Sequence, residues 1–153
     1  MPGYGILAPD EGSGLRPFSW AEERLRRSHS YWIGTTRPDG RPHVMPVWGL
    51  WLDGRVYFST GRQSVKARNL AATGRIVVTN DDPDEAVVVE GSAALLDPTD
   101  SAFARFNDAY IAKYDTDVAA MGEPVYVVTP AKVIAIDEGD FVGGATRWTF
   151  DGG

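Results

Sequence analysis

The amino-acid sequence predicts a mainly β fold, a closed or nearly closed antiparallel β-barrel with flanking helices. Two observations lead to this prediction. About seven short segments rich in β-branched and aromatic residues are separated by turn residues, whereas only two or three segments have helical spacing. The length of 153 residues is that of one domain with one core. Many short strands and few helices in a single domain favour a barrel.

The first predicted helix follows an N-terminal arm. Residues 1–18 are expected to form this arm, and residues 19–153 a single domain. The helix is expected to begin with Ser19 as N-cap and Glu22 as its capping-box partner, because arginines then fall toward the C-terminal end. Its expected role is structural.

The middle of the chain is predicted to hold five strands and one helix. Turn sequences at Pro38-Asp39-Gly40 and Asp53-Gly54 favour a three-stranded antiparallel meander. A second hairpin is expected after the helix, because two further segments are rich in β-branched and apolar residues. In order, the strands are expected at residues 31–37, 41–52, 55–60, 75–80 and 86–96, with the helix around residues 63–72.

The last third is predicted to contain a helix and three strands, at residues 99–114, 125–129, 132–137 and 147–150. The helix places Phe103, Phe106, Tyr110 and Ile111 on one face, which should pack across the end of the sheet. Pro130 is expected to separate the two middle strands, because proline cannot donate to a strand ladder. The final segment is a short strand or a tail.

Composition excludes several classes of protein. A net charge of −6 and a pI near 4.8 do not favour a surface for nucleic acid or an anionic membrane. The absence of cysteine excludes disulfides and thiolate chemistry. No Ser-His-Asp order, H-E-x-x-H string or P-loop is present, which argues against a hydrolase, a metalloprotease or a nucleotide triphosphatase. No apolar run approaches the length of a membrane span, and we expect a cytoplasmic protein without a bound metal.

A basic segment stands out against this acidic background. Three cations, Arg62, Lys66 and Arg68, surround Ser64 at the predicted start of the helix around residues 63–72. Cations there oppose the helix dipole unless an external anion compensates them. Phosphate is the usual anion at such sites. The alternative is a solvated helix with Ser64 as an ordinary N-cap.

The second predicted strand is apolar on both faces. Alternation puts Val44, Pro46 and Trp48 on one side, with Met45 and Val47 on the other. One side can face the barrel interior, so the other needs a ligand, a helix or a second subunit. Pro46 favours a sheet edge or a bulge, where a flat ligand could approach the backbone.

Four segments together resemble a known superfamily. They are TTRPDGRPHVMPVW at residues 35–48, YFST at 57–60, SVKARNL at 64–70 and TRW at 146–148. In this order and spacing they resemble the pyridoxamine 5'-phosphate oxidase-like split-barrel superfamily. Within it they are most similar to the flavin and deazaflavin oxidoreductases that use coenzyme F-420. The resemblance covers roughly residues 19–150.

The resemblance implies a six- or seven-stranded split barrel of the FMN-binding type, which forms a homodimer with two cofactor sites between the subunits. It implies that Met45, Pro46, Val47 and Trp48 lie beside the cofactor ring. It also implies that Ser59 and Thr60 touch ring or ribityl oxygens, and that Ser64, Val65 and Lys66 hold the phosphate, with Arg62 or Arg68 as a further cation. Arg147 and Trp148 would reach the neighbouring cofactor or substrate; the alternative for Trp148 is a packing anchor.

The expected activity is hydride transfer from F-420 to an unsaturated organic substrate of the enone, quinone or tetrapyrrole type. Such a cofactor carries the chemistry, so few catalytic side chains are expected and none is assigned. His29 and His43 are the only histidines, and a structural role is favoured for His43. Two alternatives remain: an FMN-dependent oxidoreductase of the pyridoxamine-phosphate-oxidase type, and a non-catalytic carrier of a cofactor or tetrapyrrole.

Overall fold

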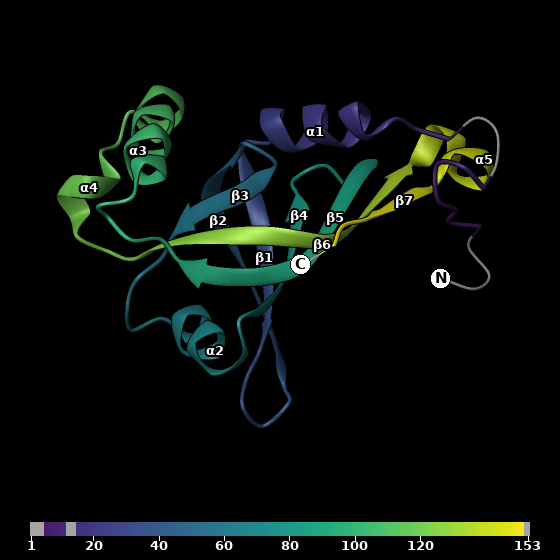
Figure 1. Ribbon diagram of the computed structural model, residues 1–153. Helices are drawn as coiled ribbons and strands as arrows, with labels where there is room; N and C mark the ends of the chain where they lie inside the picture. Colours follow the sequence, from purple (N-terminus) through teal and green to yellow (C-terminus); the bar gives the residue numbers. More distant parts are fainter. Residues whose placement is uncertain (1–4, 12–14, 152–153) are drawn as a thin grey trace.

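The computed structural model describes residues 5–11 and 15–151 (Figure 1). It contains seven strands and several helices within these residues, and its secondary structure agrees with the predicted mainly β class. In chain order the elements are α1 (Phe18–Arg27), β1 (Ser30–Thr36), β2 (Pro42–Leu52), β3 (Arg55–Ser59), α2 (Val65–Thr73), β4 (Arg75–Asn80), β5 (Glu85–Leu95), α3 (Ser101–Tyr114), α4 (Val118–Met121), β6 (Val125–Asp137), η1 (Glu138–Asp140), α5 (Phe141–Gly144) and β7 (Thr146–Thr149).

The strands form one antiparallel sheet that closes on itself. Their order is β3-β2-β1-β4-β5-β6-β7, and β3 also pairs with β6. Strands β1 to β6 therefore make a closed barrel, and β7 extends the sheet beyond β6. The predicted barrel, the first meander and the β4–β5 hairpin are confirmed. Closure satisfies the hydrogen-bonding groups that an open sheet would leave at its edges.

The prediction of two strands separated at Pro130 is wrong, because both belong to the single strand β6. It runs without interruption through Pro130, where two strands were expected. The reason lies in the pairing with β5: the register shifts between Glu90 and Gly91, where β6 carries one extra residue, Ala131. Pro130 stands opposite Gly91, and a Cβ on that glycine would lie 2.2 Å from the carbonyl oxygen of Thr129. The bulge accommodates a residue that cannot donate to the ladder.

Two apolar clusters lie on opposite sides of the barrel wall. The first fills the barrel and includes Ile33, Phe58 and Val128, each fully buried. The second lies between the wall and α3, where Phe106 and Tyr110 are buried as predicted. Ile111, predicted on the same face, is 38% exposed, and Tyr114 is buried in its place. Helix α3 therefore faces the sheet through residues spaced four apart, one turn further along than expected.

Helix α1 begins at Phe18, one residue before the predicted start. Pro17 is the N-cap and no side chain caps the helix, so the predicted capping box of Ser19 and Glu22 is wrong. The Glu22 carboxylate instead accepts a hydrogen bond from Trp51 Nε1 at 3.0 Å. The Glu22 carboxylate, predicted to cap the helix end, is thus the hydrogen-bond acceptor for the indole N–H of Trp51.

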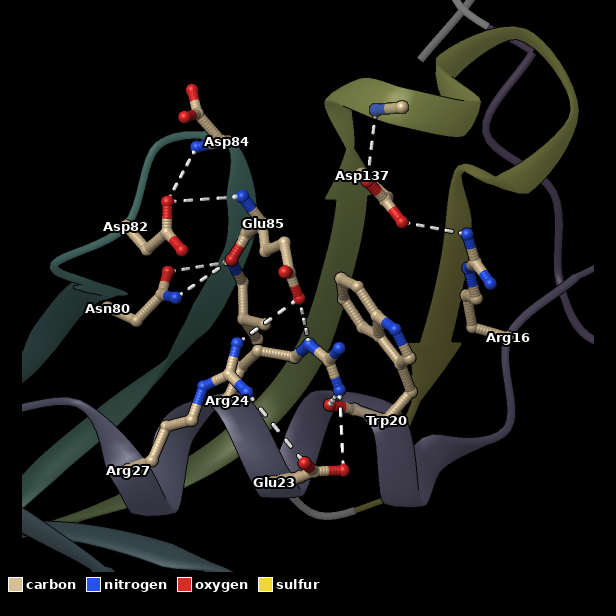
Figure 2. Close-up of polar contacts among 12 residues, drawn as sticks. Arg16, Trp20, Glu23, Arg24, Arg27, Asn80, Asp82, Asp84, Glu85 and Asp137 are labelled. Carbon is tan, nitrogen blue, oxygen red and sulfur yellow. Dashed lines mark hydrogen bonds and ion pairs between the residues drawn. The ribbon is translucent and has the colours of Figure 1, made fainter.

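Ion pairs attach α1 and the preceding residues to the barrel (Figure 2). Glu85 at the start of β5 accepts from Arg24 Nε at 2.5 Å and from Arg27 at 3.3 Å. The Arg24 guanidinium lies 4.0 Å from the centre of the Trp20 ring, and Arg16 pairs with Asp137 at 2.8 Å. Cation–π and ion-pair contacts of this kind fix the helix against the end of the β5–β6 pair.

The N-terminal residues that the structure describes contact the last strand. Ile6 is 4% exposed and packs on Ile134, while Leu7 bridges Thr146 of β7. Sequence analysis did not predict these contacts. It also missed α4, η1 and α5, which have only three or four residues each and too few positions for a periodic pattern.

Candidate functional site

Strand β2 has an edge without a neighbouring strand. Residues 42–48 pair with β1, and only residues 49–52 pair with β3. In the part of the chain that the structure describes, the other edge of residues 42–48 pairs with no strand. Figure 1 shows the β1–β2 hairpin projecting beyond the barrel on the side that also carries α2. Alternate backbone N–H and C=O groups on this edge can therefore bind a ligand.

The N-terminus of α2 offers further hydrogen-bond donors. Ser64 is the predicted N-cap, and its Oγ accepts from the Ala67 N–H at 3.1 Å. Thr60 Oγ1 lies 3.4 Å from the same oxygen. The hydroxyl hydrogen of Ser64 and the N–H groups of Val65 and Lys66 have no acceptor among the described residues. These donors and the helix dipole favour an anion at this end of α2.

Lys66 is the unusual residue of this helix. Lys66 is only 8% exposed as a residue. No hydrogen bond or ion pair joins its ammonium group to any other described residue. Burial lowers the pKa of Lys66 from its usual value. The alkyl stem of Lys66 is packed, while its ammonium keeps some contact with solvent and is free to pair with an external anion.

One hydrogen bond fixes α2 beside the β1–β2 hairpin. Asn69, one turn after Lys66, donates from Nδ2 to Thr35 Oγ1 at 3.0 Å, and both groups are buried. Thr35 stands opposite His43 in the β1–β2 ladder. Burial, Arg37 and Lys66 lower the pKa of His43 in that order, so His43 is neutral near pH 7. The anion site therefore depends on Lys66, and not on His43, for positive charge.

The two arginines considered as additional cations point to different places. The Arg62 guanidinium donates to the carbonyl oxygen of Gly122 at 3.3 Å, and the backbone N–H of Arg62 donates to the Glu123 carboxylate at 2.9 Å. Arg68 lines a hollow of about 410 Å³ between α2 and the tip of the β1–β2 hairpin. Arg37 and Arg41 line the same hollow. Arg68 thus joins the basic side of α2, and Arg62 faces the loop before β6.

The four ring-contact candidates on β2 divide between two faces. Met45 and Val47 share the face of Ile33, which belongs to the barrel interior. Pro46 and Trp48 lie on the outer face, where Pro46 stands opposite Trp32. A planar ligand can meet all four residues only along the strand edge, because alternate side chains point to opposite faces.

Three other candidates have partners within the chain. Ser59 Oγ donates to the carbonyl oxygen of Pro124 at 2.9 Å. Arg147 donates to the Ile6 carbonyl at 2.8 Å and pairs with Glu11 at 3.3 Å. Trp148 is 9% exposed and packs edge-on against Phe18 at a centroid distance of 5.3 Å. Thr60, Ser64, Val65 and Lys66 therefore lie together at the N-terminus of α2. Ser59, next to Thr60, has its hydroxyl bonded to Pro124, whereas Arg147 and Trp148 contact residues near the N-terminus.

A cluster that the sequence pattern does not predict lies where β2 changes partners. Tyr114, the last residue of α3, stacks on Trp48 with centroids 4.6 Å apart and planes 1° apart. Its hydroxyl bonds to the backbone of Gly49, and Lys113 Nζ lies 2.9 Å from the Gly49 carbonyl oxygen. Tyr114 and Lys113 end an amphipathic helix, so no local signal distinguishes them from ordinary packing residues.

Lys113 makes stability depend on pH. Burial lowers its pKa to about 8, although the Asp81 charge opposes the shift. Between pH 8 and the pKa of an unfolded lysine near 10.4, the unfolded chain binds more protons, so the free energy of unfolding rises with pH. The rise ends above about pH 10, because tyrosines begin to ionise in the unfolded chain while burial raises the pKa of Tyr114 to about 12.

We expect urea unfolding of the wild type to show this rise from about pH 8 to 10, and Lys113→Met to lose most of it, because the lowered pKa of Lys66 retains a contribution of the same sign. Lys132→Met is the matched control, because Lys132 is a surface residue paired with Glu90 at 3.0 Å. Parallel pH profiles for the wild type and Lys113→Met would contradict the assignment.

The acidic segment before β5 serves the local backbone. Asp81 accepts from the His29 N–H at 3.1 Å, and Asp82 Oδ1 accepts from the Asp84 N–H at 2.9 Å. Within residues 5–11 and 15–151, no three His, Asp or Glu side chains gather as metal ligands would. Among these residues, no helix has the length and apolar character needed to cross a bilayer.

Comparison with known proteins identifies the family of the chain. A family model described as pyridoxamine 5'-phosphate oxidase matches residues 20–137, which include β1 to β6 and the N-terminus of α2. The chain belongs to the pyridoxamine 5'-phosphate oxidase family. The predicted superfamily is therefore confirmed, and the fold of this family binds flavins. None of the curated proteins compared with the sequence matches it.

Several solved structures share the family fold. An F420 reductase is 27% identical, with 73% of this chain and 94% of that chain covered and a TM-score of 0.58. A haem-binding protein from Mycobacterium smegmatis is 20% identical, with 88% and 59% covered and a TM-score of 0.67. The haem storage protein HutZ from Vibrio cholerae is 10% identical, with 72% and 87% covered and a TM-score of 0.63. The two haem proteins show the shared fold alone.

Proposed function

We propose that the chain is an oxidoreductase that binds coenzyme F-420 and passes hydride to an unsaturated organic substrate such as an enone, a quinone or a tetrapyrrole. The observation that carries this proposal is Lys66, a largely buried residue at the N-terminus of α2 whose ammonium has no described partner. The family fold and the 27% identity to an F420 reductase support the choice of cofactor.

The residues fit a phosphorylated ring cofactor in two parts. Lys66, the Ser64 hydroxyl and the free N–H groups at the start of α2 would hold the phosphate through charge-assisted hydrogen bonds. The unpaired edge of β2 at residues 45–48 would lie along the ring. Arg68 and Arg37, beside the hollow of about 410 Å³, would attract further negative charge of the cofactor.

When bound, a reduced deazaflavin supplies the hydride. The protein then has to bind the cofactor and substrate, orient them and exclude water from the site. These tasks need few ionisable side chains at the ring. His43 is neutral near pH 7 and is not required as an acid in this scheme.

We also propose that the protein is a homodimer. The outer face of β1, β2 and β4 carries large exposed apolar side chains, with Trp32 47%, Val44 57% and Trp48 44% exposed. Burying such a face against a second copy would remove apolar surface from water at both subunits. It would also place the unpaired edge of β2 next to the interface. Sedimentation equilibrium of the purified protein should give twice the chain mass, and a monomer would contradict this part of the proposal.

A fluorescence titration tests the proposed cofactor. The apoprotein is titrated with F-420 and, separately, with FMN, whose phosphate is shared but whose ring and tail differ. Saturable binding with preference for F-420 is the expected result. Preference for FMN would move the protein to the flavin-dependent enzymes. Binding of neither would overturn the proposal and leave a carrier of another ring system.

A further inference from the structure

We propose that the last turn of α3 is a positioning device for the cofactor edge of β2, acting through Tyr114 and Lys113. This inference rests on the proposed function, because it concerns the strand along which the ring would lie. Both residues act on the backbone of β2 and are positioning residues. Neither belongs to the segments that carried the family resemblance.

Tyr114 closes the end of the β1–β2 ladder. The last pair of that ladder joins Ser30 to Trp48, so His29 and Gly49 would be the next pair. The Tyr114 hydroxyl stands between them. It lies 2.5 Å from the His29 carbonyl oxygen and 2.8 Å from that of Gly49, and it accepts from the Gly49 N–H at 2.9 Å. One side chain thus replaces the missing strand hydrogen bonds.

Lys113 makes a second bridge across the same gap. Its Nζ donates to the Ser28 carbonyl oxygen at 2.5 Å and to the Gly49 carbonyl oxygen at 2.9 Å. The ammonium also lies 5.1 Å from the centre of the Tyr31 ring and 5.0 Å from that of Tyr114. Every described contact of Lys113 is therefore with the backbone before β1, the backbone of β2 or the two aromatic rings.

The bridged residue is the point at which β2 changes neighbours. Residues 42–48 pair with β1 alone, and from Gly49 onward β2 pairs with β3 instead. A Cβ on Gly49 would lie 2.8 Å from the Tyr57 carbonyl oxygen, so the backbone packs closely at this position. Fixing Gly49 therefore sets the direction in which the unpaired edge leaves the barrel.

The same turn holds the side chain next to Gly49. Tyr114 covers one face of the Trp48 indole, and His29 meets that indole edge-on with centroids 6.1 Å apart. Trp32 is exposed to a similar degree, 47% against 44%, and within the described residues it has no stacked ring. Trp48 is thus held in one orientation, as a side chain beside a planar cofactor needs to be.

Tyr114→Phe is the decisive variant, because it keeps the stacked ring and removes the bridging hydroxyl. Tyr110→Phe is the matched control: Tyr110 lies one turn earlier, is 6% exposed, and its hydroxyl has no described hydrogen bond. Amide hydrogen exchange of peptides covering residues 28–50 reports, without any cofactor, on the clamp, by which we mean the bridge from Tyr114 and Lys113 to Gly49. F-420 titration then reports on the site.

We expect Tyr114→Phe to speed exchange in residues 28–50, to leave the β4–β5 hairpin unchanged, and to weaken F-420 binding by about tenfold. Tyr110→Phe should change neither the exchange nor the affinity. A uniform rise in exchange over the whole barrel would indicate a merely structural role and overturn the inference, as would wild-type exchange and affinity in Tyr114→Phe. If the wild type binds neither F-420 nor FMN, the proposed function fails, and faster exchange confined to residues 28–50 would still show that the clamp orders the edge.

Discussion

Lys66→Met is expected to weaken F-420 binding by about 1.5–3 kcal/mol, the usual value of a hydrogen bond to a charged group. The same change should leave the free energy of unfolding unchanged or raise it, because the methionine keeps the packed alkyl chain and removes a partly desolvated ammonium that has no described partner. Loss of affinity without loss of stability is the signature of a residue whose partner is the ligand.

Fluorescence titration measures the first quantity and urea unfolding the second. Lys132→Met again serves as the control, because it removes a lysine that pairs with Glu90 on the surface. It should change neither quantity by more than about 0.5 kcal/mol. Wild-type affinity in Lys66→Met would remove the anion site from the proposal, whatever cofactor the protein binds.

Gly91→Ala is expected to lower the free energy of unfolding by about 3 kcal/mol, toward the upper end of the cost of overpacking. Its Cβ would lie 2.2 Å from the carbonyl oxygen of Thr129 and 3.1 Å from the Pro130 Cα, both backbone atoms that a rotamer change cannot move. The bulge in β6 opposite Gly91 would have to open, and with it the pairing that carries β6 past Pro130.

Gly61→Ala provides the comparison for this prediction. A Cβ at Gly61 would meet no atom within 4 Å, so the same chemical change should be almost neutral there. Urea unfolding of both variants decides the matter. Equal stability of the two variants would show that the barrel tolerates a rearranged bulge and that the continuity of β6 does not depend on Gly91.

The anion site shows how much of the function was available before the fold was known. Ser64 as N-cap and Lys66 in the first turn of α2 follow from spacing alone, because capping and the helix dipole are local properties. The separation of the Arg62 and Arg68 side chains does not follow from their spacing in the sequence. Arg62 turns to Gly122 and Glu123, which are about sixty residues away in sequence, and no local rule predicts that contact.

The sequence pattern alone predicted the mainly β class, the order of β1 to β5, the cap of α2 and the membership of a family that includes oxidoreductases. These depend on periodicity, turn residues and short motifs, which act between near neighbours in the chain. Only the tertiary structure decided that Glu22 serves Trp51, that β6 continues through Pro130, and that Tyr114 clamps Gly49. The physical reason is the same in each case: a buried polar group or a crowded backbone must be satisfied by whichever residue the fold brings near, however distant it is in the sequence.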